Sequence, residues 1–260
     1  MESKYTWPEG EPIVYLRPPK EEYHGKLPNF YPPEWFPELD ILAKNWEAIR
    51  DEILEFEKHN GYIKGMSYFS SPAETVGAEK WSTINLMSYY RKLHSNRKKF
   101  PLLTGLTDQI DNITTVTISV LPPKTDIKPH YGDTNGIIRA HLGLVVPDHY
   151  PITAIKVGNE ERGWEDGKLL LFTVVCQHEV WSKSEHRRYV LIVDFVPKLL
   201  QHKMVEICAK TLGSQSYIFF YKKLALVRKF PEPVADFFCY LFYLIWRIYL
   251  PIQRTFPFLY

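Results

Sequence analysis

Two histidines and one arginine of this 260-residue chain have the types and the spacing for metal-assisted chemistry. His130 and His178 each lie beside a predicted strand, and neutral imidazole is the commonest protein ligand for a catalytic transition metal. Arg188 begins an apolar run ten residues after His178. A buried guanidinium there needs an anion, and its fork matches a carboxylate. These three residues are what an iron ion and a 2-oxo-dicarboxylic acid need.

Each of these residues also has an ordinary interpretation. A single histidine is more often a hydrogen-bonded core residue or a surface residue than a metal ligand. An arginine on a strand more often forms a salt bridge than binds a cosubstrate. The shared context of the three residues favours the site, and it requires a fold that brings distant segments together.

The second half of the chain has the pattern of such a fold. Stretches rich in β-branched and apolar residues alternate with turn residues such as Pro122-Pro123 and the run 165–167. Short strands with this spacing are typical of a sandwich or jelly roll. The predicted strands cover residues 114–121, 137–146, 152–157, 168–174 and 189–195.

The flanking regions have different patterns. Residues 1–37 contain eight prolines and predict an extended arm with little regular structure. Apolar residues three and four apart predict a helix over 38–59, ended by Asn60-Gly61, and a second helix is expected over 86–94. The predicted organisation is therefore an arm over 1–37, a β domain over 38–197 and a mostly helical tail over 198–260.

Composition limits the partners of the chain. Lys and Arg number 32 against 30 Asp and Glu, so the net charge is only +2 and no nucleic-acid partner is expected. Aromatic residues make up 15% of the chain, which excludes disorder as the dominant state. Three cysteines are too few for a disulfide framework or a zinc cluster and fit a reducing compartment. The first residues have no secretory-signal pattern, so a cytoplasmic location is expected.

The tail has an apolar segment with basic flanks. Residues 237–246 are ten consecutive apolar or aromatic residues, a run too short to predict a membrane-spanning helix. Basic residues on both sides make peripheral contact with the cytoplasmic face of a membrane one interpretation. A buried terminal helix and a contact between copies of the chain are the alternatives.

Several motifs between residues 30 and 197 resemble the aspartyl/asparaginyl β-hydroxylase family of iron(II)- and 2-oxoglutarate-dependent oxygenases. The most specific is SVLPPKTDIKPHYGDTN over 119–135, and a leading helix with Asn45-Trp46 is also similar. The other matching stretches are 139–144, 164–168, 178–181 and 188–194. The resemblance implies a mainly β protein, a double-stranded β-helix of the jelly-roll or cupin-like kind with flanking helices.

The resemblance assigns the metal ligands. His130 and His178 hold the iron, and the family leaves the third protein position to water. Gly132 stands where most non-haem iron oxygenases have a carboxylate. Asp133 is expected to point away from His130 along an extended segment, as an exposed turn residue.

The resemblance also assigns the cosubstrate pocket. Arg188, with Ser119, takes the distal carboxylate of 2-oxoglutarate. Arg139 and His141 lie two apart on one predicted strand, so both face the same pocket. Whether they serve the cosubstrate or a substrate carboxylate is left open, and Trp164 is interpreted as a packing or turn residue.

The implied reaction is hydroxylation of an unactivated C–H next to an acyl or carboxyl group. It consumes O2 and 2-oxoglutarate and releases succinate and CO2. The substrate is a lipid acyl chain, a small molecule or carrier-bound amino acid, or a side chain in a peptide or protein. The alternatives are a non-catalytic jelly-roll binding protein and a cupin-type isomerase, and an intact Arg188 disfavours both. The oligomeric state is open.

Overall fold

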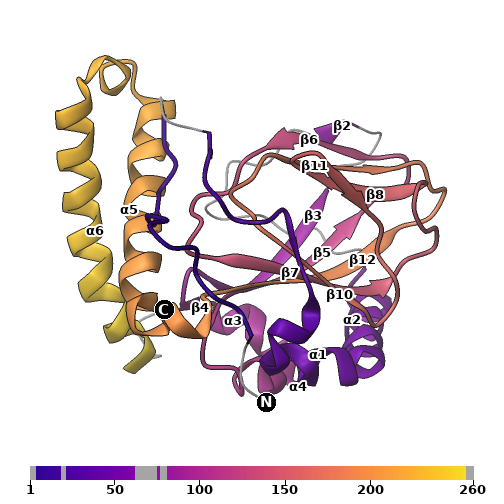
Figure 1. The fold of residues 1–260 in the computed structure, drawn as a ribbon. Helices are drawn as coiled ribbons and strands as arrows, with labels where there is room; N and C mark the ends of the chain where they lie inside the picture. The colour runs from indigo at the N-terminus through magenta and orange to yellow at the C-terminus, as the bar shows by residue number, and fades with distance from the viewer. Residues whose placement is uncertain (1–3, 19–21, 62–74, 77–80, 256–260) are drawn as a thin grey trace.

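Two antiparallel sheets face each other in the computed structural model, which describes residues 4–18, 22–61, 75–76 and 81–255 (Figure 1). In order across the larger sheet, the strands are β1 (Phe30–Tyr31), β10 (Leu169–Phe172), β7 (Ile138–Val145), β12 (Arg188–Phe195), β5 (Ile113–Leu121), β3 (Ser82–Ser88) and β4 (Arg91–Lys92). The smaller sheet consists of β2 (Thr75–Val76), β6 (Asp126–His130), β11 (His178–Ser182), β8 (Thr153–Val157) and β9 (Glu160–Arg162). The jelly-roll prediction is confirmed.

The centre of the larger sheet is buried on both faces. β5 and β12 are buried along their whole lengths and pair with Leu191 opposite Ile118. Leu191 and Val193 point to the outer face, where they join a core with Ile49 and Ile53 of the first long helix. The alternate residues of β12, among them Val190, point to the inner face against the smaller sheet. Side chains on the inner face of β12 are therefore enclosed between the two sheets.

Helices cover the outer face, as the sequence predicts, but the helix over 38–59 is split. A 3-10 turn (Pro37–Leu39) leads into α1 (Asp40–Lys44), and α2 (Trp46–Asn60) follows. The break is at Asn45, whose side-chain amide donates to the Ile41 carbonyl oxygen over 2.7 Å. Such a side-chain bond competes with the helical pattern. Gly61, with φ of +75°, ends α2 as expected.

The helix predicted over 86–94 is wrong. This stretch forms the end of β3, a tight turn at Tyr89 and Tyr90, and β4, and only its last residue belongs to a helix, α3 (His94–Arg97). Both tyrosines have positive φ, +45° and +69°. Sequence patterns reserve that conformation for Gly, Asn and Asp, so two aromatic residues gave no sign of a hairpin.

The five predicted strands are confirmed, with ends that differ by one or two residues. The strands that carry the histidines, β6 and β11, were not predicted. Each has only five residues, and β6 contains a proline, so neither has a strong β pattern. Their pairing with each other holds them in the sheet.

The N-terminal arm passes between the sheets and the tail (Figure 1). Its backbone bonds to the loop after β6: the Leu16 amide donates to the Asp133 carbonyl oxygen over 2.8 Å. The Val14 amide donates to the Asn135 side chain over 2.8 Å. The arm has little regular structure, as predicted, but these bonds fix its position.

The tail is an antiparallel pair of helices, α5 (Met204–Lys223) and α6 (Glu232–Thr255), so the helical prediction is confirmed. Residues Glu232–Arg254 are long and apolar enough, by length and composition, to cross a membrane. The expectation that no stretch is long enough is therefore corrected. The cause is that α6 continues past Arg247, where the apolar run is interrupted.

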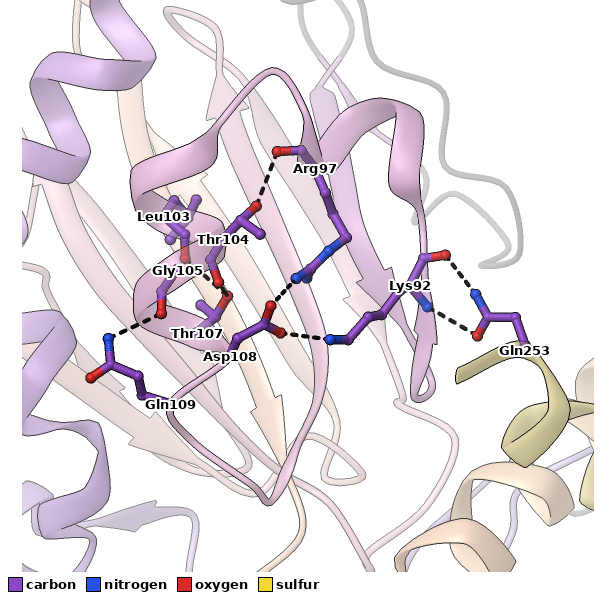
Figure 2. Close-up of polar contacts among 9 residues, drawn as sticks. All are labelled: Lys92, Arg97, Leu103, Thr104, Gly105, Thr107, Asp108, Gln109 and Gln253. Carbon is purple, nitrogen blue, oxygen red and sulfur yellow. Dashed lines mark hydrogen bonds and ion pairs between the residues drawn. The ribbon is translucent and has the colours of Figure 1, made fainter. Parts of the chain in front are cut away.

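The end of α6 is fastened to β4, as Figure 2 shows. The Gln253 side-chain amide donates to the Lys92 carbonyl oxygen over 2.8 Å and accepts from the Lys92 amide over 3.3 Å. Beside it, Asp108 accepts from the side chains of Lys92 and Arg97. The Gln253 side chain is completely buried, so it carries these bonds without competition from water.

Replacing Gln253 by leucine should remove both bonds at constant volume. We expect the free energy of unfolding to fall by about 2 kcal/mol, about 1 kcal/mol per bond. Urea unfolding measures it. Gln109→Leu is the matched control, because the exposed Gln109 amide bonds only to the Gly105 carbonyl oxygen. Equal stability of the Gln253 variant and the wild type would contradict this attachment.

Candidate active site

The two predicted metal ligands lie side by side. His130 ends β6 and His178 begins β11, and the two residues are paired across the strands. Their ring centroids are 4.1 Å apart. The pairing in the smaller sheet therefore brings together two imidazoles that are 48 positions apart in the sequence.

Each ring is held in the same tautomer. Nδ1 of His130 lies 2.8 Å from the Lys128 carbonyl oxygen, and Nδ1 of His178 lies 2.8 Å from the Cys176 carbonyl oxygen. A carbonyl oxygen only accepts, so Nδ1 carries the proton and donates. The lone pair of each neutral ring is therefore at Nε2. Histidine ligands of metal ions are typically oriented in this way, by a hydrogen bond from the other ring nitrogen.

Burial keeps both rings neutral. It lowers the pKa of His130, and it holds the pKa of His178 well below its usual range, with a further contribution from the neighbouring His130. Protonation would put a charge into the space between the sheets. Two unprotonated Nε2 atoms at neutral pH are the form that binds a metal.

Among the described residues, no group of three or more His, Cys, Asp or Glu side chains is arranged to hold a metal. A Cβ at Gly132 would lie 2.6 Å from the Val174 carbonyl oxygen, so a carboxylate side chain does not fit there without a backbone shift. The arrangement matches two histidines with the remaining positions left to other molecules.

Arg188 is a cation buried between the sheets, and among the described residues it forms no ion pair. The residue is 2% exposed, and within the described part of the chain its Nε and Nη1 atoms have no hydrogen-bond partner. Its guanidinium carbon is 4.0 Å from the centre of the Trp164 ring. Burial lowers the pKa of Arg188 to about 9, so the side chain is still charged at neutral pH. Unpaired donors of this kind suit a bound carboxylate.

Trp164 also fixes the third buried histidine. Its indole Nε1–H donates to Nδ1 of His141 over 3.2 Å, which leaves the proton of the neutral imidazole on Nε2. That Nε2 is buried and without a partner among the described residues. Burial, with the charges of Arg139 and Arg188, holds the pKa of His141 well below its usual range. His141 therefore offers a neutral donor near Arg188.

Ser119 lies on the same face as Arg188. In the pairing of β5 with β12, Arg188 is opposite Leu121 and Val190 is opposite Ser119, and side chains two apart share a face. The Ser119 hydroxyl accepts a 2.8 Å bond from the Trp81 indole, so its own O–H can donate. The predicted pair of Ser119 and Arg188 therefore shares the inner face of the larger sheet.

Arg139 lies on this face too but has a partner in the chain. Its Nε and Nη2 donate to the two carboxylate oxygens of Asp194 over 2.6 and 2.8 Å. The two residues are paired across β7 and β12. The sequence leaves two roles open for Arg139, a contact with the cosubstrate or with a substrate carboxylate, and neither includes this ion pair. Asp194 is a residue of this face that the sequence does not single out. A carboxylate within an apolar strand, opposite an arginine, was the available signal.

Asp133 is not the exposed, free turn residue that the sequence predicts. The Tyr89 hydroxyl and the Gln215 side-chain amide both donate to its carboxylate. Gln215 belongs to α5, so the loop that follows His130 is bonded directly to the C-terminal helices. Neither partner has a local sequence signal, because both bonds join distant segments.

The donor set fits an iron(II) ion and 2-oxoglutarate: two imidazole lone pairs and a buried, unpaired guanidinium. A model of the aspartyl/asparaginyl β-hydroxylase family matches residues 43–197, more than half of the chain. The chain belongs to this family.

Two relatives illustrate the range of the family. The chain is 31% identical over 173 residues to an ornithine lipid ester-linked acyl 2-hydroxylase of Rhizobium tropici, which covers 66% of this chain and 62% of that protein. It is 34% identical over 161 residues to the aspartyl/asparaginyl β-hydroxylase of Mus musculus, covering 59% and 20% respectively. The chain thus spans less than two thirds of the length of either relative.

Solved structures are more distant. A prolyl-4-hydroxylase from Pseudomonas putida aligns with a TM-score of 0.38 and 14% identity, covering 60% of this chain and 88% of that one. The fold assignment therefore rests on the strand order and pairing of this chain itself.

The histidines between the two sheets of this family member predict a loss of stability in mild acid. Unfolded histidines have a pKa of about 6.5, whereas His130, His141 and His178 have lower values when folded. Below about pH 6.5 the unfolded chain binds more protons, so stability falls as the pH falls. Between about pH 7.5 and pH 5.5 we expect a loss of up to about 1.4 kcal/mol for each histidine.

Urea unfolding of metal-free protein at the two pH values measures this loss. His141→Gln should reduce this loss by the contribution of one histidine, because it removes one of the three rings with a lowered pKa. A stability that is the same at both pH values would show that the three rings titrate normally.

Proposed function

We propose that this protein is an iron(II)- and 2-oxoglutarate-dependent dioxygenase that hydroxylates a C–H next to an acyl or carboxyl group. The observation that carries the proposal is the buried Arg188 guanidinium, whose Nε and Nη1 lack a partner among the described residues, on the sheet facing the His130–His178 pair. A dicarboxylic acid with a metal-binding end and a free carboxylate satisfies both features.

Each residue has a distinct task in this proposal. Nε2 of His130 and Nε2 of His178 hold the iron. The fork of Arg188 binds the distal carboxylate of 2-oxoglutarate, with the Ser119 hydroxyl beside it. When bound, iron(II) and 2-oxoglutarate would supply the oxidising chemistry: one oxygen atom of O2 enters the substrate C–H to give C–OH, and the other enters succinate as 2-oxoglutarate loses CO2.

The remaining residues orient these groups and exclude water. Trp164 supports the guanidinium of Arg188 through its ring and sets the tautomer of His141 through its N–H. Nε2–H of His141 is a second neutral donor for an anion in the pocket. The Arg139–Asp194 pair fixes Arg139 at the inner face, so we assign it a positioning role rather than a direct carboxylate contact.

The names of the relatives support the class of carbon that is hydroxylated. The 2-position of an acyl chain and the β-carbon of an aspartyl residue are each bonded to a carbonyl carbon. We therefore propose a substrate with a C–H of this type, either a lipid acyl chain or an amino-acid side chain. A common carbon environment explains how one site can serve both classes.

The direct test is O2-dependent conversion of 2-oxoglutarate to succinate by purified protein with iron(II) and ascorbate. His130→Ala and His178→Ala should each reduce turnover at least about a hundredfold, because one imidazole does not hold the metal. Arg188→Lys should raise the KM for 2-oxoglutarate about tenfold or more, since a point charge replaces the bidentate fork.

His186→Ala is the matched control for the histidine variants, because His186 is exposed. It should keep the wild-type rate. The absence of turnover, together with an absence of 2-oxoglutarate binding under nitrogen, would contradict the proposal and favour a non-catalytic jelly-roll binding protein. Turnover that survives loss of either histidine would contradict the metal assignment.

A further inference from the structure

One face of α6 exposes a stripe of large apolar side chains. Phe237 is 61% exposed and Ile248 is 66% exposed, and only 11% of the most apolar stretch of this helix is buried. The apolar side chains of this stripe are spaced three and four residues apart, which places them on one side of the helix. The members of the stripe are Phe237, Tyr240, Leu241, Leu244, Ile245, Ile248 and Ile252. A contiguous exposed surface of this kind marks an interaction site.

The turn between α5 and α6, the tip of this helical hairpin, carries exposed basic residues beside the stripe. Leu224 and Leu226, which are 50% and 69% exposed, stand among exposed basic residues where α5 turns into α6. No acidic residue occurs between positions 207 and 231. The basic residues of the tip are Lys222, Lys223, Arg228 and Lys229.

The acidic residues of α6, Glu232 and Asp236, lie at its start, and the charges farther along the helix are basic. Between positions 237 and 255 the only charged residues are Arg247 and Arg254, which lie seven apart and hence on one side of the helix. An apolar face bordered by Lys and Arg, with Asp236 at its start paired to Arg17, is complementary to the acyl chains and anionic headgroups of a bilayer surface. An acidic or purely apolar partner would match only one part of this surface.

Contacts on the opposite face hold α6 against the protein. The Trp246 indole donates to the Ser216 hydroxyl of α5 over 2.9 Å, and Gln253 bonds to the backbone of Lys92. Arg17 of the N-terminal arm forms an ion pair with Asp236. Because α5 is itself buried in the inner core through Ile207 and Leu212, α6 stays attached to the domain. Its outer face alone is free to enter a lipid layer, with the helix parallel to the surface.

We propose that the α5–α6 hairpin docks this protein on an anionic lipid bilayer through the α6 stripe and the basic tip. The same hairpin reaches the candidate site, since Gln215 of α5 bonds to Asp133, three residues after His130. Docking and the site therefore share one rigid element. The inference does not depend on the proposed reaction, because it rests on the surface of α6 alone.

Flotation of the full chain with vesicles tests the docking. Wild-type protein should float with vesicles of phosphatidylcholine and phosphatidylglycerol, and less with phosphatidylcholine alone or at high salt. The double variant Leu244→Glu/Ile248→Glu should lower the partition coefficient at least about tenfold, because it puts charge into the apolar face. The tip variant Arg228→Gln/Lys229→Gln should lower it roughly fivefold for each cation removed.

The matched control is Leu102→Glu/Ile152→Glu, which changes two apolar side chains that are 40% and 42% exposed and lie outside α5 and α6. It should float like the wild type. Thermal melts establish whether each variant is folded. If the α6 variant does not fold, the tip variant still tests the proposal, because it alters only exposed residues.

Wild-type protein that does not float, or floats equally whatever the variant, would overturn the proposal. A dimer in size-exclusion chromatography that the α6 variant converts to a monomer would also overturn it, because the stripe would then be a contact between two copies.

Discussion

The candidate site depends on a buried guanidinium, that of Arg188, which has no carboxylate partner among the described residues. Transfer of a cation from water into a protein interior costs several kcal/mol, and the usual compensation is a carboxylate partner. Arg139, one strand away, has such a partner in Asp194. Arg188 has the face of Trp164, and within the described residues its Nε and Nη1 have no acceptor. A cation–π contact returns only about 2 kcal/mol when desolvated. The remaining cost is understandable if an anion is bound during function.

The jelly roll makes this arrangement possible because the two halves of the site come from different sheets. The smaller sheet presents two imidazoles through one cross-strand pair. The larger sheet presents Arg188, His141 and Ser119 on its inner face. A dicarboxylate that bound a metal at one end would therefore join the two sheets. In our proposal the cosubstrate completes an interior that the chain alone leaves unsatisfied.

Much of this site is local enough to be predicted from the sequence. β-branched runs identify the long strands, and the motifs around His130 and His178 single out the two histidines that we propose as ligands. Bonds between distant segments were not predictable. Trp164 was interpreted as packing, and its bonds to Arg188 and His141 depend on a loop that returns over the inner face. The contacts of Asp194 and Gln215 could not be predicted for the same reason, because each joins distant segments.

Local sequence signals also failed to predict a turn whose backbone conformation is unusual for the residues that form it. The β3–β4 hairpin turns at two tyrosines with positive φ, a conformation that their side chains disfavour and that no composition rule anticipates. Tyr89 from this turn bonds to Asp133, so tertiary contacts hold the conformation. The length of α6 was underestimated because a single arginine interrupts its apolar run, although an exposed arginine is compatible with a continuing helix.

The stability of Arg188→Met, measured with and without 2-oxoglutarate, tests the central claim most directly. Methionine keeps an unbranched apolar stem and removes the guanidinium charge. We predict that the variant without ligand is more stable than the wild type by about 1–3 kcal/mol, since a desolvated cation is lost. We also predict that 2-oxoglutarate with Mn(II) raises the Tm of the wild type only. A variant that is less stable than the wild type, and that 2-oxoglutarate still stabilises, would contradict the account.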